Sequence, residues 1–307
     1  MKIVGSIPEE VLKIVHEREE AREKQDFVKA DRLRNEIGKL GYEIIDGEDS
    51  IEVRKIESNL FPQNSFLVLF GSGEISSVGR SIQDHIFQKL KKDNIKIVIV
   101  STPAGFQPNV ETVHEEIADF FNTSLANYHP NVEIVYANIK SDANNRTLIA
   151  PIESADYIFM GPGSPTYAVK NLESTLLLKK IIERINSGAS LALSSAAVIA
   201  VSHFCLPVYE IYKVGEDLHW ERGLNLFKDL LRKEVSFIPH FNNNEGGDKN
   251  DTSRCFMGEK RFGKLLELLP ESENVTGIDE QTSIVINLKT KEEKVMGKGD
   301  MSEVIRR

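Results

Sequence analysis

The 307-residue sequence contains only two cysteines, Cys205 and Cys255. Two isolated cysteines supply no disulfide framework, and their spacing is not that of a cysteine-based metal site. We therefore expect a chain that binds no metal and keeps its thiols reduced, as the cytoplasm does.

Long apolar runs and an excess of positive charge are also absent. The longest apolar runs have the length of buried strands, so no membrane span is expected. Residues 1–10 contain no apolar signal core, which argues against secretion. The formal net charge of −9 argues against nucleic-acid binding by the whole chain, although not by a local basic face. These absences predict a cytoplasmic protein with no membrane partner. They do not determine the oligomeric state, and a homodimer is possible.

The first forty residues differ in composition from the rest. Residues 9–40 are dense in Glu, Lys and Arg, and apolar residues recur among them at helical spacing. A break at Gln25-Asp26 predicts an antiparallel helix pair in which Asp26 caps the second helix and Gly41 ends it.

A hairpin and a linker follow this helix pair. Residues 42–45 and 51–54 are rich in β-branched side chains and flank Asp46-Gly47, a pattern typical of a β-hairpin. Residues 59–64 resemble a linker in composition. We therefore expect a small module over residues 1–58 and a larger domain over residues 64–307.

The larger domain alternates apolar runs with amphipathic stretches, which predicts a parallel sheet with helices on both faces. The expected fold class is therefore a three-layer α/β domain. The predicted strands are Phe66–Phe70, Ile95–Val100, Val132–Tyr136, Tyr157–Met160, Ser190–Leu193 and Val235–Ile238. The helices expected between them include Ile82–Lys91, Val110–Phe121 and Leu176–Ile185. Ser283–Leu288 and Glu292–Met296 predict an antiparallel hairpin at one edge.

A pair of serines follows the apolar strand Ser190–Leu193 and precedes small residues that open a helix. A serine at such a junction can be held on a sharp turn, with its hydroxyl exposed beside the N–H groups of the helix start. Ser195 is therefore the candidate nucleophile. Ala197 supplies the small residue expected two positions later, whereas Leu193 does not match the glycine usual two positions earlier. The alternative is that Ser194 or Ser195 simply caps the helix.

His240 follows the strand Val235–Ile238 and precedes a very polar loop that begins at Asn242. Ligands collect at the carboxyl ends of parallel strands, and a base must lie within hydrogen-bond reach of its nucleophile. The position of His240 favours catalysis over a structural role.

A glycine-rich turn, Gly161–Pro165, follows the strand Tyr157–Met160. Glycines at a strand end allow backbone N–H groups to approach a ligand, as an oxyanion hole requires. Pro162 has no N–H, so Gly163 or Ser164 must donate. An ordinary turn is the alternative. The Gly71–Glu74 turn is similar, and it is too short for a dinucleotide fingerprint.

An acidic residue is needed to orient His240. Glu210 and Glu280 are the candidates, and the spacing of residues does not choose between them.

These pieces together resemble the serine peptidase family of dipeptidase E and cyanophycinase, which has a class I glutamine amidotransferase-like, flavodoxin-like fold. The resemblance covers roughly residues 65–290. Gly71–Glu74 and Gly161–Ser164 look like the family's two Gly-rich turns. Ser195–Ala197 looks like its Ser-Ala-Gly segment, and His240-Phe241 looks like its His-aromatic pair. A Gly-Ile-Asp-Glu segment of cyanophycinases looks like Gly277–Glu280.

The resemblance implies a role for each site residue. On the cyanophycinase pattern Glu280 is the triad acid, whereas dipeptidase E places an acid near Glu210, and we favour Glu280. The implied activity is serine-type hydrolysis of a small peptide or amide without a cofactor. Ser195 attacks, His240 carries the proton, and the N–H groups of Gly163 and Ala196 hold the oxyanion. Substrate contacts are expected from Gly73, Glu74, Ser164, Asn242, Asn243 and Arg254.

The sequence departs from the family pattern in two places. The Ser195 segment lacks the family's glycines, and Pro162 replaces a glycine near the oxyanion site. An alternative function is therefore a ligand-binding protein of the same fold with weak or no chemistry.

The front module resembles another family. It looks like the C-terminal helical segment of cysteinyl-tRNA synthetases. The residues that carry this resemblance are Glu17–Arg22, Asp26-Phe27, Ala30–Arg34 and Gly41. No counterpart of that enzyme's catalytic signatures is present, which excludes aminoacylation. The basic side chains could meet tRNA phosphates through residues 1–58. Acidic side chains are equally dense there, so a salt-bridged helix pair is the favoured interpretation. The basic side chains in question are Arg18, Arg22, Arg32 and Arg34.

Overall fold

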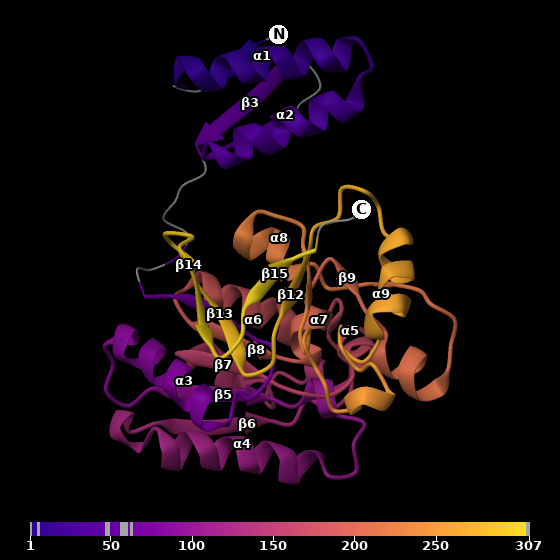
Figure 1. Cartoon of the computed structure of the whole chain (residues 1–307). Helices are drawn as coiled ribbons and strands as arrows, with labels where there is room; N and C mark the ends of the chain where they lie inside the picture. Colours follow the sequence, from indigo (N-terminus) through magenta and orange to yellow (C-terminus); the bar gives the residue numbers. More distant parts are fainter. Residues whose placement is uncertain (1, 5–6, 47–49, 56–60, 62–63, 305–307) are drawn as a thin grey trace. The chain divides into compact units, whose positions relative to one another are not determined.

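The computed structural model describes residues 2–4, 7–46, 50–55, 61 and 64–304. The chain divides into an N-terminal unit, residues 1–60, and an α/β unit, residues 61–307 (Figure 1). Most of the predicted linker, residues 59–64, lies outside the described residues.

The N-terminal unit pairs two helices with a small sheet. Its elements are β1 (Lys2–Val4), α1 (Glu9–Glu23), α2 (Phe27–Lys39), β2 (Tyr42–Asp46) and β3 (Ser50–Lys55). The predicted helix pair and antiparallel β2–β3 pairing are confirmed, and β1 adds a parallel strand to β3. The hairpin turn, residues 47–49, lies outside the described residues. The Asp26 carboxylate accepts the Lys29 N–H at 3.0 Å, and Gly41 has a φ of +82°, as the capping signals predicted.

A buried arginine joins the helices of this unit to its sheet. Arg18 is 3% exposed, and its two terminal nitrogens each lie 2.8 Å from an oxygen of Asp46 at the end of β2. Arg22 and Arg34 approach the same carboxylate at 2.7 and 3.8 Å. The hydrogen bonds from Arg18 hold the pKa of the Asp46 carboxyl below its ordinary value. Three of the four arginines considered for phosphate contacts are therefore engaged within the unit.

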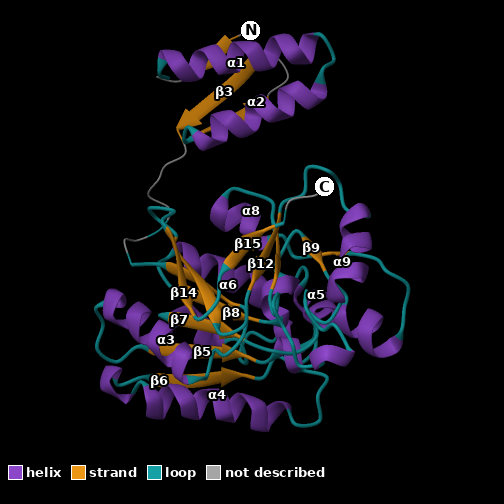
Figure 2. Cartoon of the chain, viewed as in Figure 1, coloured by secondary structure: helices purple, strands orange, loops and turns teal. Residues whose placement is uncertain are grey.

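The α/β unit is built on a seven-stranded sheet in the order β14-β13-β4-β8-β7-β5-β6 (Figure 2). The five strands from β4 to β6 run parallel, and β13 and β14 form the predicted antiparallel hairpin at one edge. The strands are β4 (Phe66–Phe70), β5 (Lys96–Val100), β6 (Asn131–Val135), β7 (Tyr157–Met160), β8 (Ser190–Ser194), β13 (Thr282–Asn287) and β14 (Glu293–Gly297).

Helices cover both faces of this sheet, which confirms the predicted three layers. Alternate residues of β4 point to opposite faces, with Phe66 and Val68 packed among residues of α3 and α4 and with Leu67 and Leu69 packed among residues of α5, α6 and α7. The helices are α3 (Ser77–Leu90), α4 (Val110–Ser124), α5 (Pro165–Leu172), α6 (Leu176–Asn186), α7 (Ala196–Ala200), α8 (Leu226–Leu231) and α9 (Gly258–Glu267).

One predicted strand belongs to a different sheet. The run Val235–Ile238 forms β11 (Ser236–Ile238), which pairs with β12 (Val275–Ile278) and not with the main sheet. A third strand, β15 (Met301–Glu303), joins β12 in the antiparallel sense. Two further short strands, β9 (Phe204–Cys205) and β10 (Glu221–Arg222), pair with each other. His240, which follows β11, therefore comes from a second sheet of the α/β unit.

None of the helices that the structure describes combines the length and the apolar character that crossing a bilayer requires.

Candidate active site

Ser195 lies between the end of β8 and the start of α7. Its backbone has φ +50° and ψ −113°, a conformation that non-glycine residues rarely adopt. Its N–H donates to the Phe70 carbonyl at the end of the neighbouring strand, at 3.3 Å. This strand-to-helix turn forms although Leu193 stands where a glycine is usual.

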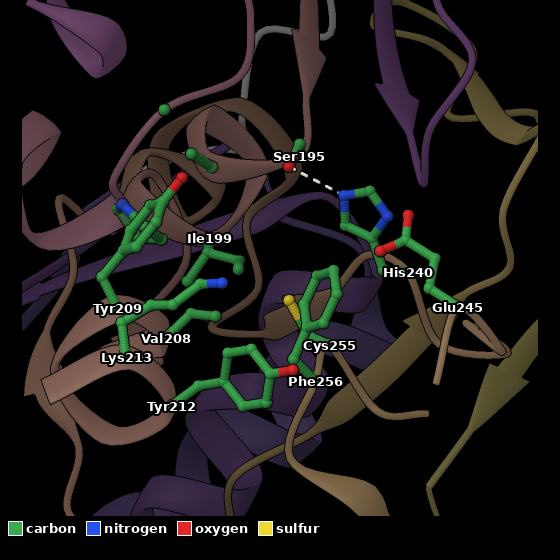
Figure 3. Close-up of a pocket in the computed structure, with 13 residues that line it drawn as sticks. Ser195, Ile199, Val208, Tyr209, Tyr212, Lys213, His240, Glu245, Cys255 and Phe256 are labelled. Atoms are coloured by element: carbon green, nitrogen blue, oxygen red, sulfur yellow. Dashed lines mark hydrogen bonds between the residues drawn. The ribbon is translucent and has the colours of Figure 1, made fainter. Parts of the chain in front are cut away.

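His240 follows β11 and also has a left-handed backbone, with φ +52°. Its Nε2 lies 2.9 Å from the Ser195 hydroxyl oxygen (Figure 3). The structure therefore brings together two residues that stand 45 positions apart, at the ends of strands from different sheets. Such a pair is the arrangement in which an imidazole can take a proton from a hydroxyl.

Glu280 lies behind the imidazole. Its Oε1 is 3.0 Å from His240 Nδ1 and also accepts a hydrogen bond from the Asn243 amide at 2.7 Å. The Glu280 N–H donates to the side-chain oxygen of Asn242 at 2.8 Å. This carboxylate can hold His240 with the proton on Nδ1, which leaves Nε2 free to accept from Ser195.

The same contacts lower the pKa of Glu280 below its ordinary value of 4.5, chiefly through the hydrogen bond from His240 and then through that from Asn243. A carboxyl with a depressed pKa in the folded state stabilises the fold at pH values above its unfolded pKa. That contribution is lost as the pH falls through the folded-state pKa.

Glu210, the other candidate acid, lies elsewhere. Its Oε1 accepts a hydrogen bond from the Thr166 hydroxyl at 2.5 Å. Its second oxygen is buried and has no hydrogen-bond partner among the described residues. The structure thus places Glu280, and not Glu210, against His240.

Two backbone N–H groups beside Ser195 are available to a ligand. The Ser164 N–H donates to the Pro103 carbonyl at 2.8 Å, which leaves Gly163 as the donor of that turn. Neither the Gly163 N–H nor the Ala196 N–H has an acceptor among the described residues, and both residues line the cavity at Ser195. Gly163 has φ +149°, and a Cβ there would lie 1.9 Å from the Pro103 oxygen, so only glycine fits.

The Gly71 turn supports the site without lining it. The Gly71 carbonyl accepts the His240 N–H at 3.2 Å, and its N–H donates to Thr282 at 2.8 Å. A Cβ on Gly71 would lie 2.1 Å from the carbonyl oxygen of Asp279, which precedes Glu280. The close backbone approach therefore fixes His240 and the Glu280 loop relative to β4.

A cavity of about 240 Å³ opens beside Ser195 and His240 (Figure 3). Most of its wall is apolar or aromatic. Tyr209, Tyr212 and Lys213 come from a segment that ends in a π-helical turn, Glu210–Val214, which the sequence patterns did not identify. The lining residues are Gly163, Pro165, Ser195, Ala196, Ile199, Val208, Tyr209, Tyr212, Lys213, His240, Glu245, Cys255 and Phe256.

The residues expected to contact substrate lie outside this lining. Asn242 and Asn243 hold Glu280, and Ser164 caps α5 by accepting the Tyr167 N–H at 3.2 Å. The Arg254 guanidinium lies 4.0 Å from the centre of the Phe241 ring. Gly73 and Glu74 belong to the turn that precedes α3, where the Gly73 carbonyl accepts the Ser76 hydroxyl hydrogen at 2.6 Å.

Both cysteines are buried. Burial, and then the charge of Glu280, raise the pKa of the Cys255 thiol to about 12, so it remains a neutral thiol at pH 7 although it lines the cavity. Burial likewise raises the pKa of Cys205. Among the described residues, no group of three His, Cys, Asp or Glu side chains is placed to hold a metal ion.

The strained backbone at Ser195 leads to a prediction about stability. Ser195→Gly should raise the free energy of unfolding by about 1 kcal/mol, because glycine relieves an unfavourable φ/ψ at a smaller cost in chain entropy. Ser195→Ala, the control, keeps the strain. Urea denaturation of both variants measures the difference, and a glycine variant no more stable than the alanine variant would contradict this account.

Comparison with known proteins finds a separate match for each of the two units. The model of the cysteinyl-tRNA ligase anticodon binding domain matches residues 5–54. Cysteine–tRNA ligases from Chlamydia muridarum and Caldicellulosiruptor saccharolyticus are 50% and 38% identical to this chain over 52 residues. That segment is 17% of this chain and only 11% of either ligase.

The α/β unit matches a peptidase family. A crystal structure of a peptidase from an acI-B1 Actinobacterium aligns with a TM-score of 0.57 and 20% identity, covering 78% of this chain and 97% of that one, which shows a shared fold. The model of peptidase family S51 matches residues 67–293, a span that contains Ser195, His240 and Glu280. The chain therefore belongs to peptidase family S51.

Proposed function

We propose that this member of the family is a serine-type hydrolase that cleaves an amide or peptide bond in a small substrate. The observation that carries the proposal is the continuous line of hydrogen bonds from Ser195 Oγ through His240 to Glu280, at 2.9 and 3.0 Å. In such an arrangement the imidazole accepts a proton at Nε2, and the Glu280 carboxylate at Nδ1 stabilises the positive charge that results.

The proposed reaction begins with attack of Ser195 Oγ on the substrate carbonyl, as His240 Nε2 takes the hydroxyl proton. The negative charge on the carbonyl oxygen is met by the N–H groups of Gly163 and Ala196. The protonated His240 then gives its proton to the leaving amine, and an acyl-enzyme ester forms. Water, deprotonated by His240, hydrolyses that ester and restores the Ser195 hydroxyl.

The alternative of an inactive binding protein predicts the same fold without working chemistry. The backbone at Ser195 favours the enzyme, because a φ of +50° is unfavourable and a simple helix cap would not require it. The Gly163 and Ala196 N–H groups, which have no acceptor among the described residues, also favour the enzyme, because an oxyanion hole requires such donors.

A serine-reactive fluorophosphonate separates the two alternatives. We expect covalent labelling at Ser195, located by peptide mass spectrometry, and no labelling of folded Ser195→Ala. Heat-denatured wild type is the control for nonspecific reaction. Folded wild-type protein that does not label would favour the inactive binding protein.

The two candidate acids can be distinguished by substitution. Glu280→Gln should slow labelling by about 10³–10⁴-fold, because an amide cannot stabilise the imidazolium that forms during attack. Glu210→Gln should change the rate by less than about threefold, since the Glu210 carboxylate contacts Thr166 and not His240. Equal losses in the two variants would refute the assignment of Glu280.

We also propose that the N-terminal unit contacts tRNA, a second activity suggested by the name of the matching domain. The observation that favours it is the exposed apolar pair Phe27 and Val28 at the start of α2, which are 62% and 85% exposed on a helix that also carries exposed Lys29 and Arg32. An exposed aromatic ring can stack on an unpaired base, and exposed cations on the same helix can meet phosphates.

A tRNA-binding measurement tests this second proposal. Phe27→Ala and the double variant Lys29→Ala/Arg32→Ala should each weaken binding of a tRNA mixture, and the double variant should also reduce the salt dependence. Lys89→Ala/Lys91→Ala, two exposed lysines of the α/β unit, is the control. Wild-type protein that binds no tRNA at low salt would exclude the activity.

A further inference from the structure

The turn Arg254–Phe256, which follows the polar loop after His240, has an unusual backbone. Its three residues have φ values of +55°, +57° and +68°, and none of them is glycine. Residues with a side chain enter this left-handed region mostly one at a time, because their Cβ then lies close to the following carbonyl oxygen. A run of three is unfavourable and persists only where the surrounding structure holds it. Resting on the hydrolase proposed above, we infer that this turn positions the His240 imidazole and that Asp251 is a positioning residue acting through the turn.

The backbone of the turn is bonded to the backbone of the base. The Cys255 N–H donates to the His240 carbonyl at 3.2 Å, and the Arg254 N–H donates to the Phe241 carbonyl at 2.9 Å. The Arg254 guanidinium donates to the same Phe241 carbonyl at 3.0 Å. Successive N–H groups of the turn therefore hold successive carbonyls of the segment that carries the imidazole.

The side chain of Phe256 reaches the imidazole itself. Its ring centre lies 5.9 Å from that of His240 and 5.4 Å from that of Tyr212, and Figure 3 shows it between those two rings. The hydrogen bonds to Ser195 and Glu280 hold the two nitrogens of the imidazole. An aromatic ring packed against the imidazole restricts the tilt of its plane, which hydrogen bonds at two edge atoms restrict less.

The Asp251 carboxylate fixes both ends of the turn. One oxygen accepts the Ser253 N–H at 3.0 Å and the Ser253 hydroxyl hydrogen at 2.6 Å, and the other accepts the Glu259 N–H at 2.8 Å. Ser253 precedes the three left-handed residues, and Glu259 lies in the first turn of α9. A single side chain thus spans the strained segment and opposes its relaxation. Asp251 is exposed and lies outside the cavity lining, so its replacement removes no wall of the cavity.

The kinetics of fluorophosphonate labelling test the inference, because saturation with reagent separates its binding constant from the rate constant of attack by Ser195. Asp251→Ala should lower that rate constant about 10- to 100-fold, since a misplaced base takes the hydroxyl proton less readily. The binding constant should stay within about threefold of wild type, since no wall of the cavity is removed. Asp251→Asn, which keeps one acceptor oxygen, should give an intermediate rate constant. Asp248→Ala should label like wild type, because Asp248 is an exposed carboxylate of the same loop that forms none of the three hydrogen bonds.

The nuclear magnetic resonance signals of His240 provide a second readout. In wild type we expect one tautomer, with the proton on Nδ1 in the hydrogen bond to Glu280, in ¹H–¹⁵N spectra of histidine-labelled protein. The signals missing from His240→Gln identify this imidazole. Asp251→Ala and Phe256→Ala should each broaden or shift them, whereas Phe256→Tyr, which keeps the ring, should retain the wild-type pattern.

A purely structural role of Asp251 predicts other results. An Asp251→Ala protein that unfolds at a lower urea concentration, yet keeps the wild-type rate constant and His240 signals, would overturn the inference. Equal losses in Asp248→Ala would overturn it as well. If the alanine variant does not fold, Asp251→Asn decides by the same two measurements. Folded wild type that does not label would refute the hydrolase, and the His240 signals would then decide the inference alone.

Discussion

The close backbone contact at Gly71 is the constraint on which the site depends. The Gly71 carbonyl accepts the His240 N–H, and the Gly71 N–H donates to the Thr282 carbonyl. The Asp279 carbonyl lies so close to Gly71 that a Cβ would not fit there. These contacts tie β4 of the main sheet to the two loops that carry the base and the acid. The distances of 2.9 and 3.0 Å along the hydrogen-bonded line are therefore consequences of backbone packing, and not of the flexible side chains alone. A larger residue at position 71 would displace both loops at once.

Much of this arrangement could be predicted from the sequence, because the signals are local. Apolar runs located the strands of the main sheet, and residues at strand ends identified Ser195, His240 and the Gly163 turn. The separate sheet that contains β11 could not be predicted in this way, because an apolar run specifies a buried strand and not its neighbour. Glu280 and Glu210 were equally acceptable on spacing alone, and only the resemblance favoured Glu280. The contacts with Asn243 and Thr166 provide a physical reason for the difference.

The cavity walls were the least predictable part of the site. Tyr209 and Tyr212 belong to a segment with a π-helical turn, in which neither the helical nor the strand period applies. Polar loop residues were expected to meet substrate because they follow His240 in sequence. Asn242 and Asn243 instead use their side chains to hold Glu280, through its backbone N–H and its carboxylate respectively.

The distribution of polar groups fits the proposed chemistry. Asn243 donates to the Glu280 carboxylate and Asn242 accepts the Glu280 backbone N–H, and both contacts hold the carboxylate that faces the imidazole. The backbone, through Gly163 and Ala196, supplies the donors with no acceptor among the described residues. The cavity beside them is lined mainly by apolar and aromatic side chains and also by Lys213 and Glu245. In the hydrolase proposed above, proton transfer takes place at the fixed imidazole, and the backbone donors meet the charge that develops on the substrate carbonyl.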